Sequence, residues 1–216
     1  MKSIRFLQNA GGWIRDHLIS PINLKLALRA LSCALIICGI FSLTGLCISC
    51  RDIESKLLRF HILAHSDSDE DQQLKLHVRD AILQYSDRWF ADCQSKEEAV
   101  AAARSHLAEI RSKAQETVRK AGYDYPVEAY VTNMSFDTRV YEDFTLPAGH
   151  YDAVRIVIGS GQGHNWWCVL YPAVCVPSAE KKIGSALTKN ETDLVTHHDQ
   201  YIVSFRLIEW LNDIFG

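Results

Sequence analysis

Charge is scarce in the N-terminal quarter of the chain. The first thirty residues hold a single acidic residue against five basic ones, and Ala30 to Ser49 then runs for twenty residues with no charged side chain. At about 1.5 Å per residue, a helix of that length spans about 30 Å, the thickness of the hydrocarbon core of a bilayer. We therefore predict a transmembrane helix at 30–49, preceded by a basic cytoplasmic segment at 1–29.

The basic flank also predicts the orientation of this helix. Positive residues stay in the cytoplasm, so 51–216 is expected outside. The apolar run is longer than the core of a typical signal peptide, which favours an uncleaved signal anchor. Small residues around Gly45 leave a cleaved signal as an alternative. Lipidation at Cys47 is a further alternative, although Leu46 before it is larger than lipoprotein signals use. The expected location is the cell membrane, single-pass with the C-terminal domain outside, or secretion.

The exported part lacks a basic excess. Residues 51–216 carry eighteen basic and twenty-five acidic residues, a net of −7, which gives no electrostatic reason to bind nucleic acid. About 165 residues without a visible internal repeat suit one domain. Of the seven cysteines, this part holds Cys93, Cys168 and Cys175, in a compartment where disulfides can form. Cys93 has no nearby partner in the sequence and is expected to be a free thiol.

Hydrophobic periodicity predicts a strand and then a helix. Leu57–Ala64 is a short apolar run that suits a buried strand. An amphipathic helix follows as far as Trp89, with Ser66 or Asp67 as its N-cap and acidic residues in its first turn. The acidic run lacks the sixth-position glycine and the twelfth-position acid of a calcium loop, so no metal site is expected.

A second helix and a set of strands complete the pattern. Ser95 and Glu98 form a capping box for one long helix, which Gly122 ends. From Pro126 the period changes to two. The predicted strands are 127–134 and 137–144, joined by a turn at 133–137, then 153–158 and 166–171. A polar loop at 178–198 and an amphipathic helix at 201–215 close the chain. The predicted fold is α+β: an N-terminal transmembrane helix, then one domain of amphipathic helices on a mostly antiparallel sheet.

The stretch Gly149–Cys175 concentrates the residues that could carry chemistry. It contains two apolar runs, a tryptophan pair and a loop with glycines at Gly159, Gly161 and Gly163. A phosphate-binding loop needs a helix N-terminus after the glycines, whereas a strand follows here. We therefore interpret the loop as a hairpin connection and expect no cofactor.

A thiol nucleophile is the enzymatic alternative for this stretch. His164 precedes Cys168 by four residues and Asp152 is nearby in the sequence, so the alternative function is a secreted or anchored thiol-dependent hydrolase that uses Cys168 and His164. Strand alternation places Cys168 on the same side as Trp166 and Leu170, the buried side. Apolar burial raises the pKa of a thiol and makes it unreactive, which disfavours catalysis.

A disulfide between Cys168 and Cys175 is the favoured interpretation. Seven extended steps would separate the two Cα atoms by more than about 20 Å, so the chain must reverse, and Tyr171–Ala173 offers a turn. Closing this loop would stabilise the fold by about 2.5 kcal/mol in the chain-entropy account.

The tryptophan pair suggests a contact surface. Trp166 and Trp167 point to opposite faces of the strand, so at most one of them belongs to the core. We predict that the exposed one, together with His164 and Asn165, contacts a protein partner.

Two blocks of the sequence resemble the stage II sporulation protein R family. The first runs from Leu58 to Leu83, with His65 where the family usually has Asn. Its motif residues are Ser66, Asp67, Ser68, Asp71, Gln72, Lys75, Arg79 and Asp80. The second block comprises Leu146–Gly149, Tyr151, Gly159, Gly161, Gly163, Asn165–Val169, Pro172 and Cys175. The resemblance implies structural roles for the first-block residues and for Gly149, Gly159, Gly161 and Gly163.

The resemblance also implies a function. Family members are made in the forespore of endospore-forming bacteria and exported into the space between the two septal membranes. There they activate a membrane-embedded aspartic protease of the mother cell, which removes the pro-segment of a sigma-factor precursor. On this resemblance the chain is a signalling protein and not an enzyme, with a protease partner, a membrane helix, no small-molecule substrate and no nucleic acid.

Overall fold

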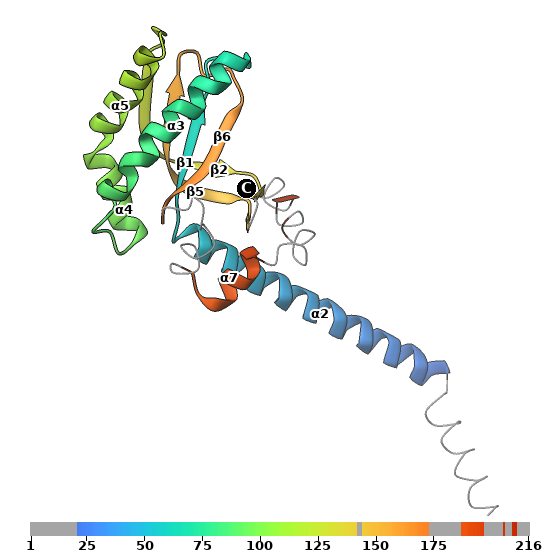
Figure 1. Cartoon of the computed structure of the whole chain (residues 1–216). Coiled ribbons are helices and arrows are strands. Elements are labelled where there is room, and N and C mark those ends of the chain that lie inside the picture. The colour runs from blue at the N-terminus through green and yellow to red at the C-terminus, as the bar shows by residue number, and fades with distance from the viewer. Residues whose placement is uncertain (1–20, 142–143, 173–186, 197–204, 206–208, 211–216) are drawn as a thin grey trace, which may run out of the picture. The chain divides into compact units, whose positions relative to one another are not determined.

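The computed structural model describes residues 21–141, 144–172, 187–196, 205 and 209–210 (Figure 1). The chain divides into two compact units, Met1–Cys47 and Ile48–Gly216. Of the expected cytoplasmic segment, 1–29, the structure describes residues 21–29.

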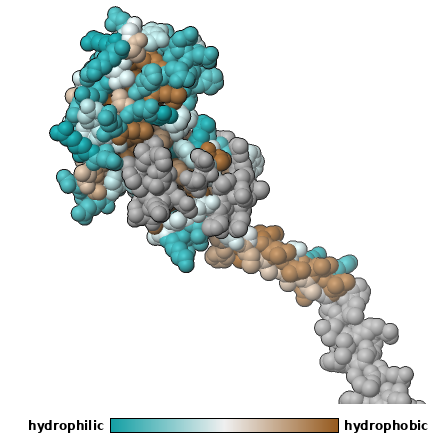
Figure 2. Space-filling model, in the orientation of Figure 1, coloured by the Kyte–Doolittle hydropathy of each residue, from teal (hydrophilic) through white to brown (hydrophobic). Residues whose placement is uncertain are grey.

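Helix α2 spans Pro21–Glu54 and contains the whole predicted membrane segment. The span Leu24–Glu54 is long and apolar enough to cross a bilayer, by length and composition. Most of its large apolar side chains from Leu24 to Ile48 are exposed, as the brown helix in Figure 2 shows. Exposed apolar surface of this extent is unfavourable in water and suits a lipid environment. The predicted apolar helix is confirmed, with longer bounds.

The last turn of α2 belongs to the second unit. Cys50 and Ile53 are buried there, and Glu54 accepts a hydrogen bond from the backbone N–H of His150 at 3.3 Å. Glu54 also packs against Gly149, where an added Cβ would overlap its carboxylate. Burial raises the pKa of Glu54.

A four-stranded mixed sheet forms the centre of the second unit. Its strands are β1 (Leu58–Leu63), β2 (Val127–Phe136), β5 (Gly149–Ile158) and β6 (Asn165–Tyr171), in the order β2-β5-β1-β6. β1 runs parallel to β5, and the other two pairs are antiparallel. The short strands β3 (Arg139–Val140) and β4 (Thr145–Leu146) pair separately. The α+β class with a mostly antiparallel sheet is confirmed.

The predicted strand neighbours are wrong in two places. β2 does not turn back onto 137–144, because it continues to Phe136 and pairs along its whole length with β5. β5 and β6 are not a hairpin either, since β1 lies between them. Alternation in the sequence shows which face a side chain takes but not which strand lies alongside. The glycine loop therefore crosses the end of β1.

Three helices cover one face of the sheet: α3 (Asp69–Trp89), α4 (Lys96–Ser105) and α5 (Leu107–Lys120) (Figure 1). The predicted long second helix is two helices, because His106 leaves helical geometry with φ −92° and ψ 4°. The side chain of Ser95 accepts from the N–H of Glu98, which confirms that cap. The N-cap of α3 is Ser68, one or two residues later than predicted.

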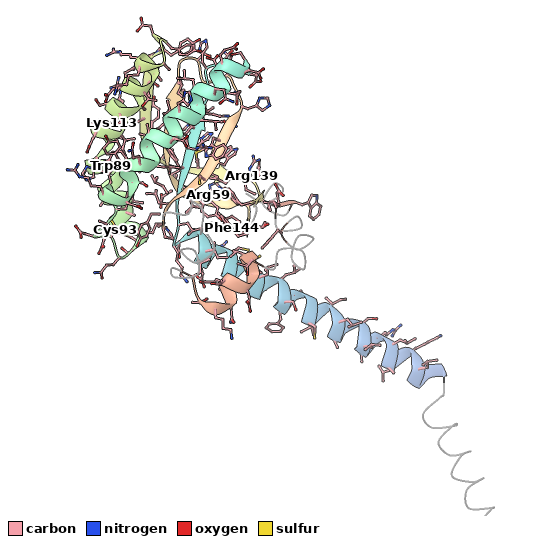
Figure 3. All side chains as sticks on the ribbon, in the orientation of Figure 1. Arg59, Trp89, Cys93, Lys113, Arg139 and Phe144 are labelled. Atoms are coloured by element: carbon pink, nitrogen blue, oxygen red, sulfur yellow. The ribbon has the colours of Figure 1, made fainter. Side chains whose placement is uncertain are left out.

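The core lies between these helices and the sheet. It takes alternate residues from each strand and the apolar stripe of each helix, among them Phe60, Ile62, Val78, Ile82, Ile110, Val118, Val154, Ile156, Cys168 and Leu170. Burying one such side chain contributes roughly 1.5–3 kcal/mol. In Figure 3, Trp89 and Lys113 lie among the helices, whereas Arg59, Arg139 and Phe144 lie on the other side of the sheet.

One helix lies in the segment predicted to be a polar loop. α7 spans Lys189–Thr196, and its Glu191 is buried and paired with Lys56 at 2.6 Å. Glu191 and Thr188 also bond to each other's backbone N–H groups, which is a capping box. This Thr/Glu spacing is present in the sequence, although the polarity of the segment favours a loop. The predicted helix at 201–215 lies mostly outside the described residues.

Candidate interaction site

The two sequence blocks meet at the carboxyl end of β1. As the chain leaves the sheet, the backbone of Gly163 donates to the carbonyl of Ala64 at 3.0 Å. The hydroxyl of Ser160 donates to the carbonyl of His65 at 2.7 Å, and the N–H of Gln162 donates to the same carbonyl at 3.3 Å. The glycine loop is therefore bonded to the first block, about a hundred residues earlier.

The glycines have separate structural reasons. Gly159 and Gly161 have φ of +59° and +63°, a region that other residues adopt only with strain. At Gly163 an added Cβ would overlap the backbone carbonyl of Ser66. The predicted structural role of this loop thus has a physical basis in close backbone approach, with no anion cradle at a helix N-terminus.

The first motif residues cap α3. The side chain of Ser68 accepts from the N–H of Asp71, and the hydroxyl of Ser66 donates to the carboxylate of Asp71 at 2.5 Å. The side-chain amide of Gln72 donates to the carbonyl of Ser66 at 2.8 Å. Asp71 is buried, and these bonds supply the acceptors and donors that its burial requires. The run is a helix start, as predicted.

Asp67 holds the second block from the other side. Its Oδ1 accepts a hydrogen bond from the backbone N–H of His164 at 2.6 Å. The same oxygen lies 2.5 Å from the Nδ1 of His164. The His164 side chain is 78% exposed, so its backbone is anchored while its ring faces solvent. A solvent-exposed contact of this kind adds little stability.

The tryptophans differ from the prediction, which placed one of them on an exposed surface. Both are half-buried. Arg79 lies over the ring of Trp166 at 4.5 Å and pairs with Asp80 at 2.7 Å. On the opposite face, Trp167 stacks on His61 with centroids 4.0 Å apart and planes 2° apart. The exposed members of the predicted contact patch are His164 and Asn165.

The residues of the hydrolase alternative are not brought together. Cys168 is 7% exposed and lies in the core. His164 is four residues away along an extended strand, about 13 Å at roughly 3.3 Å per residue, and its ring is paired with Asp67. Asp152 pairs with Lys96 at 2.6 Å at the opposite end of the sheet. No nucleophile–base contact links these described residues.

Two further expectations concern the cysteines and metals. Cys93 is a free thiol, as predicted, and burial raises its pKa. Cys175 lies outside the described residues, so its pairing with Cys168 stays a prediction. Within the described part of the chain, no cluster of His, Cys, Asp and Glu side chains could hold a metal ion.

Sequence reasoning missed Arg59 and His61. Both are buried, 0% and 2% exposed, on the face of β1 away from the helices. Arg59 lies against Phe136 and Tyr151, at 4.3 and 5.0 Å from the ring centroids, and donates to the carbonyl of Cys168. The signal was the alternation of basic and apolar residues in LRFHIL. Read by period, it predicts two polar side chains on one face.

Comparison with known proteins supports a family assignment. A sequence model of stage II sporulation protein R matches residues 54–181, which include both motif blocks. The stage II sporulation protein R of Bacillus subtilis (strain 168) is 36% identical over 187 residues, covering 76% of this chain and 84% of that relative. No solved structure matches the chain. On these matches, the chain belongs to the stage II sporulation protein R family.

Proposed function

We propose that this chain is an exported signal that activates a membrane-embedded aspartic protease, which then processes the precursor of a mother-cell sigma factor. Membership of the family supports a sporulation signalling role. The observation that carries the proposal is the family match across 54–181, because it includes the whole junction between the α3 cap and the glycine loop. The apolar helix fits a membrane anchor or a signal sequence.

The arrangement of side chains favours a signal over an enzyme. The sulfur of Cys168 is in the core, away from His164 and Asp152. A general base must lie within hydrogen-bond reach of the group that it activates. In this proposal the chain acts by binding the protease and not by catalysis. The binding domain lies outside the cytoplasm.

Reconstitution tests the proposal. The full chain, the protease and the sigma precursor are produced together in a non-sporulating bacterium, and precursor cleavage is followed by immunoblot. Cleavage is expected only with all three proteins and an intact protease active site. A variant without residues 30–49 should accumulate in the cytoplasm and give no cleavage. Stable production of all three proteins without cleavage would contradict the proposal.

A further inference from the structure

One row of side chains crosses the sheet on the face away from α3–α5. The strand registers place Tyr130 of β2 beside Arg155 of β5, Arg155 beside His61 of β1, and His61 beside Trp167 of β6. Directly opposed residues project to the same face, and neighbouring strands lie about 4.8 Å apart. The four side chains are therefore contiguous. Arg139 of β3 adds a second cation, 5.2 Å from the centroid of Trp167. We call these five residues the cationic row.

The cationic row contains N–H groups without acceptors. Among the described residues, the buried Nε atoms of Arg155 and Arg139 have no hydrogen-bond partner, and neither does Nη1 of Arg59, two residues before His61 on β1. A buried polar group left unpaired costs about 1–3 kcal/mol, and more when it is charged. Such groups need an explanation, and an acceptor from water, from an ion or from a binding partner would supply one.

The acids near the cationic row do not satisfy these arginines. Asp137 is 3.5 Å from Nη2 of Arg139, but it is 72% exposed and leaves Nε unpaired. Glu128 accepts a hydrogen bond from the hydroxyl of Tyr130. Within the described part of the chain, Arg155 makes no ion pair with either acid. The row keeps a local positive charge on a domain that carries a net −7.

Part of the cationic row is open to solvent. Tyr130 is 45% exposed and the side chain of Arg139 is 39% exposed, while Arg155 and Trp167 are half-buried. Along the row, Tyr130, Arg155, Trp167 and Arg139 alternate aromatic and guanidinium groups around the buried His61, and this alternation suits an extended peptide. Planar guanidinium groups bind carboxylates with two parallel hydrogen bonds.

We propose that the cationic row docks an acidic, extended segment on the outer side of the protease that this chain activates. The choice of that partner rests on the function proposed above. An anionic membrane surface is the other source of negative charge, but a domain with a net of −7 is repelled by it as a whole. A short acidic segment meets only the local charge. Arg155, between Tyr130 and His61 in the row, carries the recognition.

Co-purification tests the docking separately from activation. Full-length chain and protease are solubilised together from membranes, and the protease recovered with the chain is quantified at rising salt. Recovery is expected to fall with salt and to drop by about tenfold or more in Arg155→Glu. Arg119→Glu, an exposed arginine of α5, is the matched control and should bind as the unaltered chain does. Replacing one acid of the docking segment by lysine should restore binding to Arg155→Glu.

Each outcome bears on one proposal. Arginine-dependent recovery without precursor cleavage upholds docking and overturns activation. No recovery of protease with the unaltered, folded chain overturns docking. Equal losses in the two arginine variants indicate unspecific charge effects and also overturn it. The docking proposal is also overturned if Arg155→Glu weakens binding to phosphatidylglycerol vesicles but leaves the recovery of protease unchanged. Thermal unfolding of every variant confirms that each is folded.

Discussion

The ammonium group of Lys75 donates a hydrogen bond to the backbone carbonyl of His164 at 2.9 Å, across 89 positions of the chain. Lys75 lies on α3 and is 5% exposed, and its other acceptor is the side-chain oxygen of Gln72 at 2.5 Å. Desolvation by burial lowers the pKa of Lys75. This bond ties the helix of the first motif to the strand of the second, so the two motifs form one structural unit.

Lys75→Met is expected to weaken this unit. The change removes the donor to the carbonyl oxygen of His164 and to the side-chain oxygen of Gln72. A buried acceptor that is left unpaired costs about 1–3 kcal/mol. The free energy of unfolding of the full chain in detergent, measured with denaturant, should fall by about 2 kcal/mol. Lys120→Met is the control, since Lys120 is 75% exposed and its ion pair with Glu116 lies at the surface. Its effect should stay within about 0.5 kcal/mol.

Gly163→Ala is expected to destabilise more than Gly122→Ala. At Gly163 the new methyl group would overlap the carbonyl of Ser66, so backbone must move. At Gly122 the φ of +88° costs about 1 kcal/mol for a residue with a Cβ, but the space around it is open. Melting temperatures of the two variants separate the effects. Equal shifts would mean that the loop yields easily at Gly163.

The stability of the fold should depend on pH through His61. Burial, together with the charges of Arg155 and Arg139, lowers the pKa of His61 from 6.5 to about 4. Between pH 6.5 and about 4, His61 is protonated in the unfolded chain but neutral in the folded chain. The free energy of unfolding therefore falls as the pH falls through this range. The loss across this window is about 3 kcal/mol.

A pH series of denaturant unfolding measures this dependence. His61→Gln should remove most of the slope between pH 6.5 and 4. His77→Gln, at an exposed position of α3, should leave the slope unchanged. An unaltered slope in His61→Gln would show that other groups cause it.

Cys168 and Cys175 are expected to form a disulfide in the exported protein. Alkylation without reductant under denaturing conditions, followed by mass spectrometry, should label Cys93 and leave Cys168 and Cys175 unlabelled. Cys168→Ser should then lower the free energy of unfolding by about 2–3 kcal/mol. Labelling of Cys168 and Cys175 in the exported, unreduced protein contradicts the pairing.

The domain is expected outside the cytoplasm. Added protease should digest it in intact protoplasts while leaving a cytoplasmic marker protein whole. If the helix is an uncleaved anchor, a membrane-embedded fragment that contains residues 30–49 remains. Digestion that requires lysis of the protoplasts would reverse the orientation.

Much of the local structure was predictable because it depends on neighbouring residues. The uncharged run from Ala30 predicts an apolar helix, and the alternation around Cys168 predicts that this side chain lies in the core. Ser95 with Glu98 predicts a cap. These signals involve residues at most a few positions apart, so no tertiary information is needed to read them.

The class of the fold, the faces of its strands and the family can all be inferred from the order of the amino acids. The position of β1 between β5 and β6 depends on tertiary contacts, and the row of Tyr130, Arg155, His61 and Trp167 follows from that position. Strand neighbours depend on which apolar faces fit together across long stretches of chain, and a period of two is the same whichever strand lies alongside. The bond from Lys75 to His164 has the same origin, because it exists only where the end of β1 brings the glycine loop onto α3.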